Sequence, residues 1–412
     1  MRKVASLFLF LIPLSIWGQF DLNKVANPEK YGLSSARLQE MNHYMHSLVD
    51  SNALAGIQTA VIRKGQLVHY DSYGFANLEE KIALNEKSIF RIFSMTKPIT
   101  SVALMQLFEQ GKFELNDPLS KFIPEFENPK VYQDSILVLA QTPIRIIDLL
   151  RHSSGLSYGR GVPQELAAYY GRAQLYGSED IAEFTRRASA LPLQFEPGTD
   201  WQYGISTSIC GRLIEVLSGQ ELNDYLQEHL FLPLEMTDTH FQLPVTKVER
   251  FTVGYRWSEE QGLYVSEDQR SNRYTREVSL YNGGGGLVST LKDYLNFCQM
   301  LLNKGKFKDK QLLKEKTIAL MLQDHLTEIR PRHERLRLPP NEFGFGLGFA
   351  IRGSAETGLE KVYGWGGAVG TYFKIDTENE MAYVMMIQIS PYRHLRLRER
   401  FHQFVQSARL KN

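Results

Sequence analysis

Apolar positions recur along this chain at two different spacings, and the change from one to the other divides it into regions. Between residues 35 and 50 they stand three and four positions apart, which predicts an opening amphipathic helix. Two runs of strand-forming residues follow at 56–65 and 66–75. They meet at Lys64-Gly65 and predict a β-hairpin. From about residue 95 to 300 the helical spacing dominates. The helices predicted there span 95–110, 179–190, 206–218, 221–229 and 289–303.

Strand patterns return in the last part of the chain, before a closing helix. The predicted strands span 343–353, 361–367, 369–377 and 380–390, and the helix spans 393–408. Strands at both ends around a helical middle predict an α+β fold, in which one antiparallel sheet is built from both termini, flanked by helices and interrupted by a mostly helical region. A single domain over 19–412 is expected, with its sheet region at about 30–94 and 283–412 and its helical region at about 95–282. A cleft between the two regions is the natural place for a site.

The first eighteen residues have the features of a secretory signal peptide. Arg2 and Lys3 precede a short apolar run from Val4 to Trp17, and small Gly18 follows. An uncleaved membrane anchor is the alternative, but the run is too short to span a bilayer comfortably. We therefore expect cleavage near Gly18, no stable membrane insertion afterwards, and export to the periplasm or the medium. Loss of Arg2 and Lys3 leaves 45 basic and 46 acidic residues, a net charge of −1.

Composition excludes several classes of protein. Apolar residues make up 43% of the 412 positions, enough for a large buried core. The 47 basic and 46 acidic residues nearly cancel, so nucleic acid is not an expected partner, and the Arg-rich runs at 330–337 and 393–400 are interpreted as solvated faces. Cys210 and Cys298 lie in apolar helical patterns, which favours buried free thiols over a disulfide. The ten His residues show no metal-ligand spacing, so neither a metal nor a cofactor is expected.

The strongest candidate for chemistry is the tetrad from Ser94 to Lys97. In a helix that begins here, three residues turn the chain by about 300° and both side chains share one face. Pro98 supports a helix start, because proline is tolerated in the first helical turn. A serine hydroxyl is a poor nucleophile until a neighbouring base takes its proton, and the lysine is a candidate for that base. The motif alone is weak, since Ser289 and Lys292 form a second copy in which Ser289 or Thr290 is a good helix N-cap.

Further motifs separate the two copies. Ser94-Met95-Thr96-Lys97, Trp201-Gln202-Tyr203-Gly204 and Tyr363-Gly364-Trp365-Gly366-Gly367 follow one another along the chain, with the connecting segments 149–159, 195–204, 232–241 and 283–290 between them. Together, over residues 30 to 395, they resemble the serine β-lactamase and penicillin-recognising superfamily, in particular class C β-lactamase-like serine hydrolases and carboxylesterases. The resemblance implies a β-lactamase/transpeptidase-like fold and places the nucleophile helix at 95–110.

The resemblance also implies a role for each motif. Ser94 would be the acylated nucleophile, and Lys97 and Tyr203 would share the general-base and proton-shuttle work. The backbone N–H groups of Ser94 and Ala368 would form the oxyanion hole. Trp365, Gly366 and Gly367 would border the substrate, and glycines suit an edge strand along which a substrate lies closely. Whether Lys97 or Tyr203 accepts the serine proton stays open.

Two departures from the usual motifs favour an esterase. Tyr203 is followed by Gly204-Ile205, where β-lactamases and D,D-peptidases usually have Tyr-x-Asn. Trp365 stands where the third motif usually begins with Lys or His, so the cation that would pair with a substrate carboxylate is missing. We expect an exported carboxylesterase that acts on short-chain esters. The alternatives are a β-lactamase, a D-amino-acid peptidase or D,D-carboxypeptidase, and a penicillin-binding-type sensor that deacylates slowly. The partner is accordingly a small-molecule ester, lactam or peptide, and no oligomeric state is indicated.

Three further features have plainer interpretations. Gly283–Gly286 invites a phosphate-loop interpretation, but no Gly-Lys-Ser/Thr follows, so a flexible turn before a helix is favoured. His152 precedes Ser153-Ser154-Gly155, which is not G-x-S-x-G, so a role in stabilising a turn is expected. Tyr158 follows that turn and is a weaker candidate for lining the cleft.

Overall fold

The structure, a computed structural model, describes residues 20–410 apart from 268–272, 328, 330–342 and 354–360. The predicted leader and the Arg-rich run at 330–337 therefore lie outside the described residues. The described helices are α1 Ser35–Asp50, α2 Thr96–Glu109, α3 Ile146–Leu150, α4 Gln164–Ala173, α5 Ile181–Ser189, α6 Ser206–Ser218, α7 Leu222–Leu226, α8 Leu291–Leu302, α9 Glu315–Met321 and α10 Leu397–Ser407. The described strands are β1 Gly56–Arg63, β2 Gln66–Asn77, β3 Ile82–Ala83, β4 Phe90–Arg91, β5 Lys130–Gln133, β6 Ile136–Leu139, β7 Gly254–Ser258, β8 Gly262–Glu267, β9 Val288–Ser289, β10 Lys306–Phe307, β11 Lys310–Gln311, β12 Phe343–Phe345, β13 Ala350–Arg352, β14 Val362–Gly366, β15 Tyr372–Asp376, β16 Met381–Met386 and β17 Ile389–Ser390.

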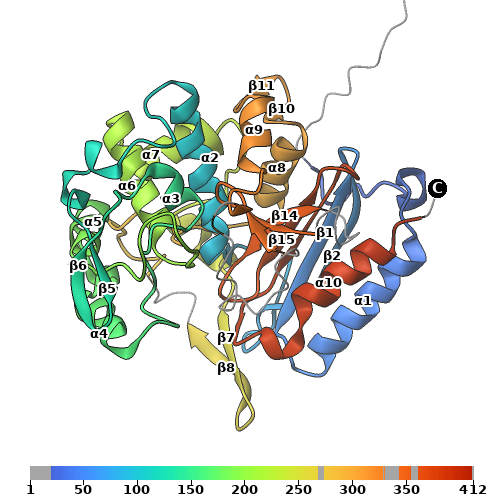
Figure 1. The fold of residues 1–412 in the computed structure, drawn as a ribbon. Helices are drawn as coiled ribbons and strands as arrows, with labels where there is room; N and C mark the ends of the chain where they lie inside the picture. The colour runs from blue at the N-terminus through green and yellow to red at the C-terminus, as the bar shows by residue number, and fades with distance from the viewer. Residues whose placement is uncertain (1–19, 268–272, 328, 330–342, 354–360, 411–412) are drawn as a thin grey trace, which may run out of the picture.

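One antiparallel sheet of eight strands, built from both ends of the chain, lies at the centre of the molecule (Figure 1). Its strand order is β12-β13-β14-β15-β16-β1-β2-β3. The N-terminal hairpin β1–β2 joins the C-terminal strands where β1 pairs with β16, from Gln58 opposite Met386 to Arg63 opposite Met381. This arrangement confirms the α+β, β-lactamase/transpeptidase-like fold predicted from the sequence.

Helices cover both faces of this sheet. On one face Ile57 and Val61 of β1 pack into a core shared with α1 and α10, and on the other Ala60 and Ile62 join the larger core with α2 and α8. Because successive side chains of a strand point to opposite faces, a strand covered on both faces is mostly apolar. Figure 1 shows α1 and α10 on one side of the sheet and α2, α3, α5, α6 and α7 gathered on the other. None of the described helices is long and apolar enough to cross a membrane.

Three C-terminal predictions are wrong in their extent. The run 343–353 forms two strands, β12 and β13, because the chain turns back at Gly346–Phe349. Glycines permit this turn: a Cβ on Gly346 would lie 2.1 Å from the Met321 carbonyl oxygen, and Gly348 has a φ of 93°. The run 380–390 ends as β16 at Met386, and β17 pairs in parallel with β7 in another sheet. The closing helix begins at Leu397, since Arg396 before it has a φ of 49°.

The region 95–282 contains hairpins as well as the predicted helices. β5–β6 and β7–β8 both lie within it, and neither was predicted. The strands of β5–β6 have only four residues each and are largely exposed, so they carry little apolar alternation. The predicted helices at 95–110, 179–190, 206–218 and 289–303 correspond to α2, α5, α6 and α8. α6 has the predicted bounds, and the other three helices are two or three residues shorter than predicted. Cys210 and Cys298 are buried free thiols, as expected.

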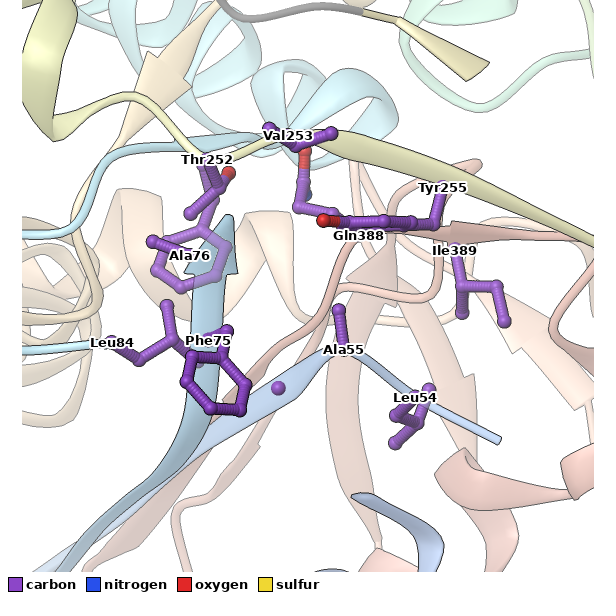
Figure 2. A pocket seen from close by; sticks show the side chains of 12 residues that line it. Leu54, Ala55, Phe75, Ala76, Leu84, Thr252, Val253, Tyr255, Gln388 and Ile389 are labelled. Carbon is purple, nitrogen blue, oxygen red and sulfur yellow. The ribbon is translucent and has the colours of Figure 1, made fainter. Parts of the chain in front are cut away.

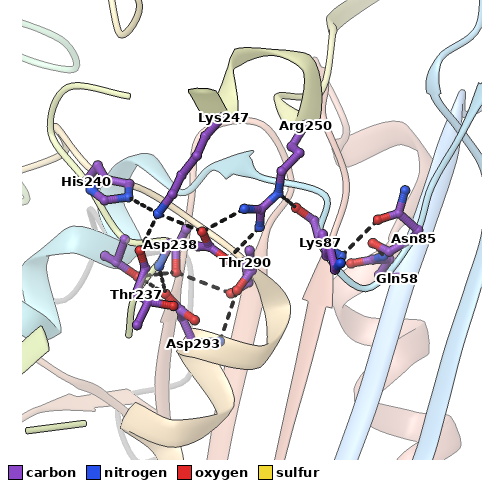
Figure 3. Close-up of polar contacts among 12 residues, drawn as sticks. Gln58, Asn85, Lys87, Thr237, Asp238, His240, Lys247, Arg250, Thr290 and Asp293 are labelled. Carbon is purple, nitrogen blue, oxygen red and sulfur yellow. Dashed lines mark hydrogen bonds and ion pairs between the residues drawn. The ribbon is translucent and has the colours of Figure 1, made fainter. Parts of the chain in front are cut away.

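A polar cluster ties the chain after α7 to the first turn of α8 (Figure 3). The Asp238 carboxylate accepts hydrogen bonds from Arg250 and forms an ion pair with Lys247, whose Nζ lies 2.9 Å from Asp238 Oδ1. The Asp293 carboxylate is buried and accepts from the Asp238 N–H at 2.8 Å and the Thr239 hydroxyl at 2.9 Å. Thr290 caps α8 by accepting from the Asp293 N–H, which confirms the N-cap interpretation of the second S-x-x-K copy.

Asp293 makes the free energy of unfolding depend on pH. Burial outweighs the hydrogen bonds and raises the pKa of this carboxyl to about 7, whereas an unfolded Asp titrates near 3.9. The folded chain therefore keeps a proton that the unfolded chain loses between about pH 4 and 7, so this contribution to stability is full below pH 4 and is lost as the pH rises to 7. In Asp293→Asn we expect the free energy of unfolding to change less between pH 4 and 7 than it does in the parent chain, by up to about 4 kcal/mol. Denaturant unfolding at pH 4, 5, 6 and 7 measures the difference, and parallel curves for the two proteins would contradict it.

Candidate active site

Ser94 lies at the junction between the sheet and the helical region. β4 leads into a 3₁₀ turn, Phe93–Met95, and α2 begins directly after it at Thr96. Phe93 has a φ of 42°, a left-handed conformation that costs a non-glycine residue about 1–3 kcal/mol and is found most often at functional sites. Ser94 is half-buried, and its hydroxyl has no hydrogen-bond partner among the described residues. The strained turn thus presents an uncommitted hydroxyl at the N-terminal end of α2.

Lys97, the second residue of α2, is buried and only 2% exposed. Its Nζ donates hydrogen bonds to the Tyr158 hydroxyl at 2.8 Å and to the Gly284 carbonyl oxygen at 2.5 Å. The ring centre of Tyr203 lies 4.8 Å from the same nitrogen. The phenol bonded directly to the lysine is therefore Tyr158, and Tyr203 lies alongside it.

Tyr203 lies among aromatic side chains from several segments. Its hydroxyl oxygen accepts a hydrogen bond from the indole N–H of Trp365 at 3.1 Å, so two motifs 162 positions apart meet here. The rings of His152, Tyr158 and Trp365 have their centres 5.0, 5.4 and 5.0 Å from the centre of the Tyr203 ring. Such tilted aromatic pairs hold one another in place. Trp365 thus fixes the position of the Tyr203 oxygen.

Burial shapes the titration of the groups around Lys97. It raises the pKa of Tyr158 well above the usual value for a phenol, and the nearby Tyr203 raises it further. It lowers the pKa of His152 far below the usual imidazole value, and the Lys97 ammonium adds to this. The Nδ1 atom of His152 is buried and has no partner within the described part of the chain. At neutral pH the Tyr158 hydroxyl is therefore protonated and the His152 ring uncharged.

The end of β14 runs beside the Ser94 turn. β13 pairs with β14 only as far as Gly364, so Trp365 and Gly366 pair with β15 alone. β14 as a whole is therefore an interior strand, which corrects the expectation of an edge strand, although its last two residues have one open side. Gly367 passes so close to the Ser94 turn that a Cβ would lie 2.5 Å from the Ile92 carbonyl oxygen. Ala368 follows and is exposed.

Arg398 of α10 contacts the end of β14 and the residues after it from the other face of the sheet. Its guanidinium donates to the carbonyl oxygens of Gly367 and Thr371, the latter at 2.9 Å. A Cβ on Gly366 would lie 2.4 Å from the Arg398 Cζ. The glycine at 366 thus makes room for an arginine, and the interpretation of residues 393–400 as a solvated face is wrong for Arg398. No pattern in the sequence indicates this contact, because it depends on where α10 crosses the sheet.

The small apolar hollow in Figure 2 lies away from this site. It is formed where β1, β2 and β7 approach one another, and its lining includes Ala55, Phe75, Thr252, Tyr255 and Gln388. None of the predicted catalytic residues lines it. Among the described residues, no group of three or more His, Cys, Asp and Glu side chains is placed to hold a metal ion.

Residues 41–406 match the family model described as Beta-lactamase, which is most of the chain. The chain belongs to this family. Protein Rv1367c of Mycobacterium tuberculosis is 30% identical over 84% of this chain and 89% of its own. A putative D-alanyl-D-alanine carboxypeptidase of Escherichia coli (strain K12) is 25% identical over 93% and 90%. Esterase EstB of Burkholderia gladioli is 28% identical over 56% and 57%.

A solved structure agrees with the beta-lactamase family assignment at the level of the fold. EstCE1, a hydrolase with promiscuous acyltransferase activity, superimposes with a TM-score of 0.75 and 23% identity over 91% of this chain and 98% of its own. The family match, together with the similarity to Esterase EstB, makes the protein a serine hydrolase.

The departures from the usual beta-lactamase-family motifs have structural counterparts. Gly204 lies against the chain at Leu156, where a Cβ would be 2.3 Å from the carbonyl oxygen. Ile205 is 1% exposed and is the N-cap residue of α6, so no polar amide points into the site from this position. Trp365 takes the place of the Lys or His and contacts Tyr203 instead of offering a positive charge.

The structure also shows which residues the sequence undervalued within this beta-lactamase-family site. Tyr158, a weak candidate for lining the cleft, is the direct partner of Lys97. Gly283–Gly286 forms the predicted turn, but its tight contacts with α2 and α6 hold the carbonyl of Gly284 against Lys97. His152 lies in a turn as expected, with its ring in the aromatic cluster. The signal in the sequence was that His152 and Tyr158 flank a run of small and polar residues, and that Gly283–Gly286 is itself a run of small residues.

Proposed function

We propose that the protein is an exported carboxylesterase that forms an acyl-enzyme on Ser94 and acts on short-chain, uncharged esters. The observation that carries the proposal is the contact of Trp365 with Tyr203, because it puts an indole where relatives place a substrate-binding cation. At this position the site offers aromatic surface and no positive charge to a carboxylate. The export follows from the leader sequence alone.

In the proposed acylation step, Ser94 Oγ attacks the ester carbonyl carbon as Tyr203 or Lys97 takes its proton. The backbone N–H groups of Ser94 and Ala368 hold the developing oxyanion; one such donor typically contributes about 10²–10³ in rate. The C–O bond to the alcohol breaks, and the alcohol leaves with the proton. A water molecule then attacks the acyl-Ser94 ester by the reverse route, which releases the acid and restores the hydroxyl.

The position of the groups supports these roles. Lys97 is buried and bonded to a neutral phenol and a carbonyl, so its Nζ stays fixed next to the Tyr203 ring. The Trp365 indole holds the Tyr203 oxygen, and Arg398 holds the carbonyl of Gly367 directly before Ala368. Lys97, Tyr203 and the segment before Ala368 are thus each oriented by a neighbour, which is how an active site keeps its geometry during reaction.

A second candidate function is cleavage of D-amino-acid peptides or β-lactams. It is favoured by the 25% identity over nearly the full chain with a putative D-alanyl-D-alanine carboxypeptidase. Such substrates carry a carboxylate, so charge preference separates the two proposals.

Matched substrates test the charge preference directly. We expect kcat/KM for p-nitrophenyl butyrate to exceed that for mono-p-nitrophenyl succinate, which adds a carboxylate at the end of a chain of similar length, by at least about tenfold. Turnover of nitrocefin should be lower still, about 10²-fold or more below the neutral ester, because a buried or unpaired carboxylate costs several kcal/mol. Equal or better turnover of the two anionic substrates would reverse the ranking in favour of the peptidase or β-lactamase.

A further inference from the structure

Lys374 of β15 is a buried cation on the face of the sheet that α1 and α10 cover. Tyr372, two residues earlier on the same strand, packs against the core on that face, whereas Phe373 and Ile375 belong to the core with α2 and α8 on the other. Because alternate side chains of a strand share a face, Lys374 points with Tyr372 toward the side of α10. It therefore lies behind the proposed active site, across the sheet from Ser94.

The Lys374 ammonium has no anionic partner among the described residues. The side chain is 4% exposed, and its Nζ makes neither a hydrogen bond nor an ion pair there. The ring centre of Tyr372 lies 5.9 Å from this nitrogen. Nζ is not sealed in the core, because it keeps contact with water. A buried charge without a partner costs several kcal/mol, so a native structure normally supplies one.

Two guanidinium groups lie near this ammonium. Burial, followed by the charges of Arg352 of β13 and Arg398 of α10, lowers the pKa of Lys374 to about 7. The Arg398 Cζ lies 5.6 Å from the same Tyr372 ring centre. Its Nη2 donates to two backbone carbonyls, whereas its Nη1 is open to water and has no partner within the described structure. The Glu399 carboxylate acts on Arg398 but is exposed and forms no ion pair with it.

The two cationic side chains lie over a strand that has no side chains beneath them. A Cβ on Gly364 would lie 3.0 Å from Lys374 Cδ, and a Cβ on Gly366 would lie 2.4 Å from Arg398 Cζ. β14 thus leaves room for both stems between the sheet and α10. The Tyr372 hydroxyl is also open to water and has no partner in the part of the chain described. Burial raises its pKa above the usual value for a phenol, so it is a donor at neutral pH.

We propose that Lys374 binds a small oxyanion here, a carboxylate or a phosphate group, with Arg398 Nη1 and the Tyr372 hydroxyl as further donors. Ammonium and guanidinium groups donate and never accept, and their hydrogen bonds to anionic oxygens are the strong ones. A neutral ligand would leave the lysine charge unpaired, and a cation would be repelled. Because Arg398 also holds the Gly367 carbonyl, the anion lies one side chain away from the proposed oxyanion hole.

Titration calorimetry of the mature chain with sulfate and with acetate tests the proposal. The measurement is made at pH 6, where Lys374, with a pKa of about 7, is mostly charged. Chloride at the same ionic strength is the control for screening. We expect saturable binding of at least one of the two oxyanions and none of chloride. Tighter binding of sulfate would identify a phosphate-type ligand, and tighter binding of acetate a carboxylate.

Two variants place the anion. Lys374→Met keeps an unbranched stem without the charge, so it should weaken binding at least about tenfold. Its Tm without oxyanion should rise, because an unpaired buried charge is removed. Tyr372→Phe leaves all the charges in place and should weaken binding about two- to tenfold, the usual contribution of one hydrogen bond. It also keeps the proposal testable if Lys374→Met does not fold.

Lys292→Met is the matched control for the loss of one positive charge. Lys292 likewise has no partner among the described residues, but it belongs to α8, which packs on the other face of the sheet. Binding should be unchanged in this variant. Sulfate also stabilises proteins by exclusion from their surface, without saturation, so calorimetry and not Tm decides. No saturable binding of either oxyanion, or undiminished binding in Lys374→Met or Tyr372→Phe, would overturn the proposal. Hydrolysis by Ser94 is a separate readout, and its absence would leave the anion result intact.

Discussion

Ser94→Ala is expected to remove ester hydrolysis almost completely while the protein stays folded. The loss in kcat should be at least about 10⁴-fold, because no covalent intermediate can form and only oriented binding remains. Stability should be nearly unchanged, since the hydroxyl has no hydrogen-bond partner among the described residues and is half-buried. Initial rates with p-nitrophenyl butyrate and the Tm of the variant measure the two effects.

Ser289→Ala is the matched control for this prediction. It removes the serine of the other S-x-x-K, which is buried and shares a hydrogen bond of 2.8 Å with the Thr239 hydroxyl. We expect a small loss of stability, about 1 kcal/mol, and an unchanged kcat. Intact-mass spectrometry should find an acyl adduct on the parent chain and on Ser289→Ala but not on Ser94→Ala. Retained hydrolysis in Ser94→Ala would refute the assignment of the nucleophile.

The two phenols next to Lys97 should respond differently to loss of their hydroxyls. Tyr203→Phe is expected to lower kcat by about 10²–10⁴, the usual contribution of a general acid–base group. Its Tm should change little, because the variant keeps the ring of residue 203 and its contacts with His152, Tyr158 and Trp365. Tyr158→Phe removes an acceptor from a buried ammonium, so it should lower Tm clearly and kcat by less than Tyr203→Phe does.

The same two variants also show which phenol acts as the general base for Ser94. Rates across pH 6–10 for both variants, with Tm measured in the same buffers, separate a loss of chemistry from a loss of structure. A larger fall in kcat for Tyr158→Phe than for Tyr203→Phe would transfer the proposed general-base role from Tyr203 to Tyr158. The comparison is decisive because Tyr158 is the phenol in contact with the Lys97 Nζ.

Local patterns predicted much of this fold because the corresponding forces are local. The helix at 35–50 was predicted to the residue, since its apolar face repeats at helical spacing and Ser34 caps it. The hairpin β1–β2 followed from two strand-forming runs around Lys64-Gly65, both of which have positive φ. The short hairpins at 130–139 and 254–267 were missed, because contacts with the rest of the molecule rather than an apolar pattern select them.

The sequence by itself determined the architecture, the family, the position of the S-x-x-K helix and the motifs that reach the site. It also determined that Trp365 replaces a cation, since that is a matter of residue identity. Only the tertiary structure decided that Tyr158 rather than Tyr203 bonds to Lys97, that Trp365 donates to Tyr203, and that Arg398 fills the space beside Gly366. The physical reason is range: periodicity and capping act over a few residues, whereas these contacts join side chains 32 to 162 positions apart and exist only after the sheet and helices have packed.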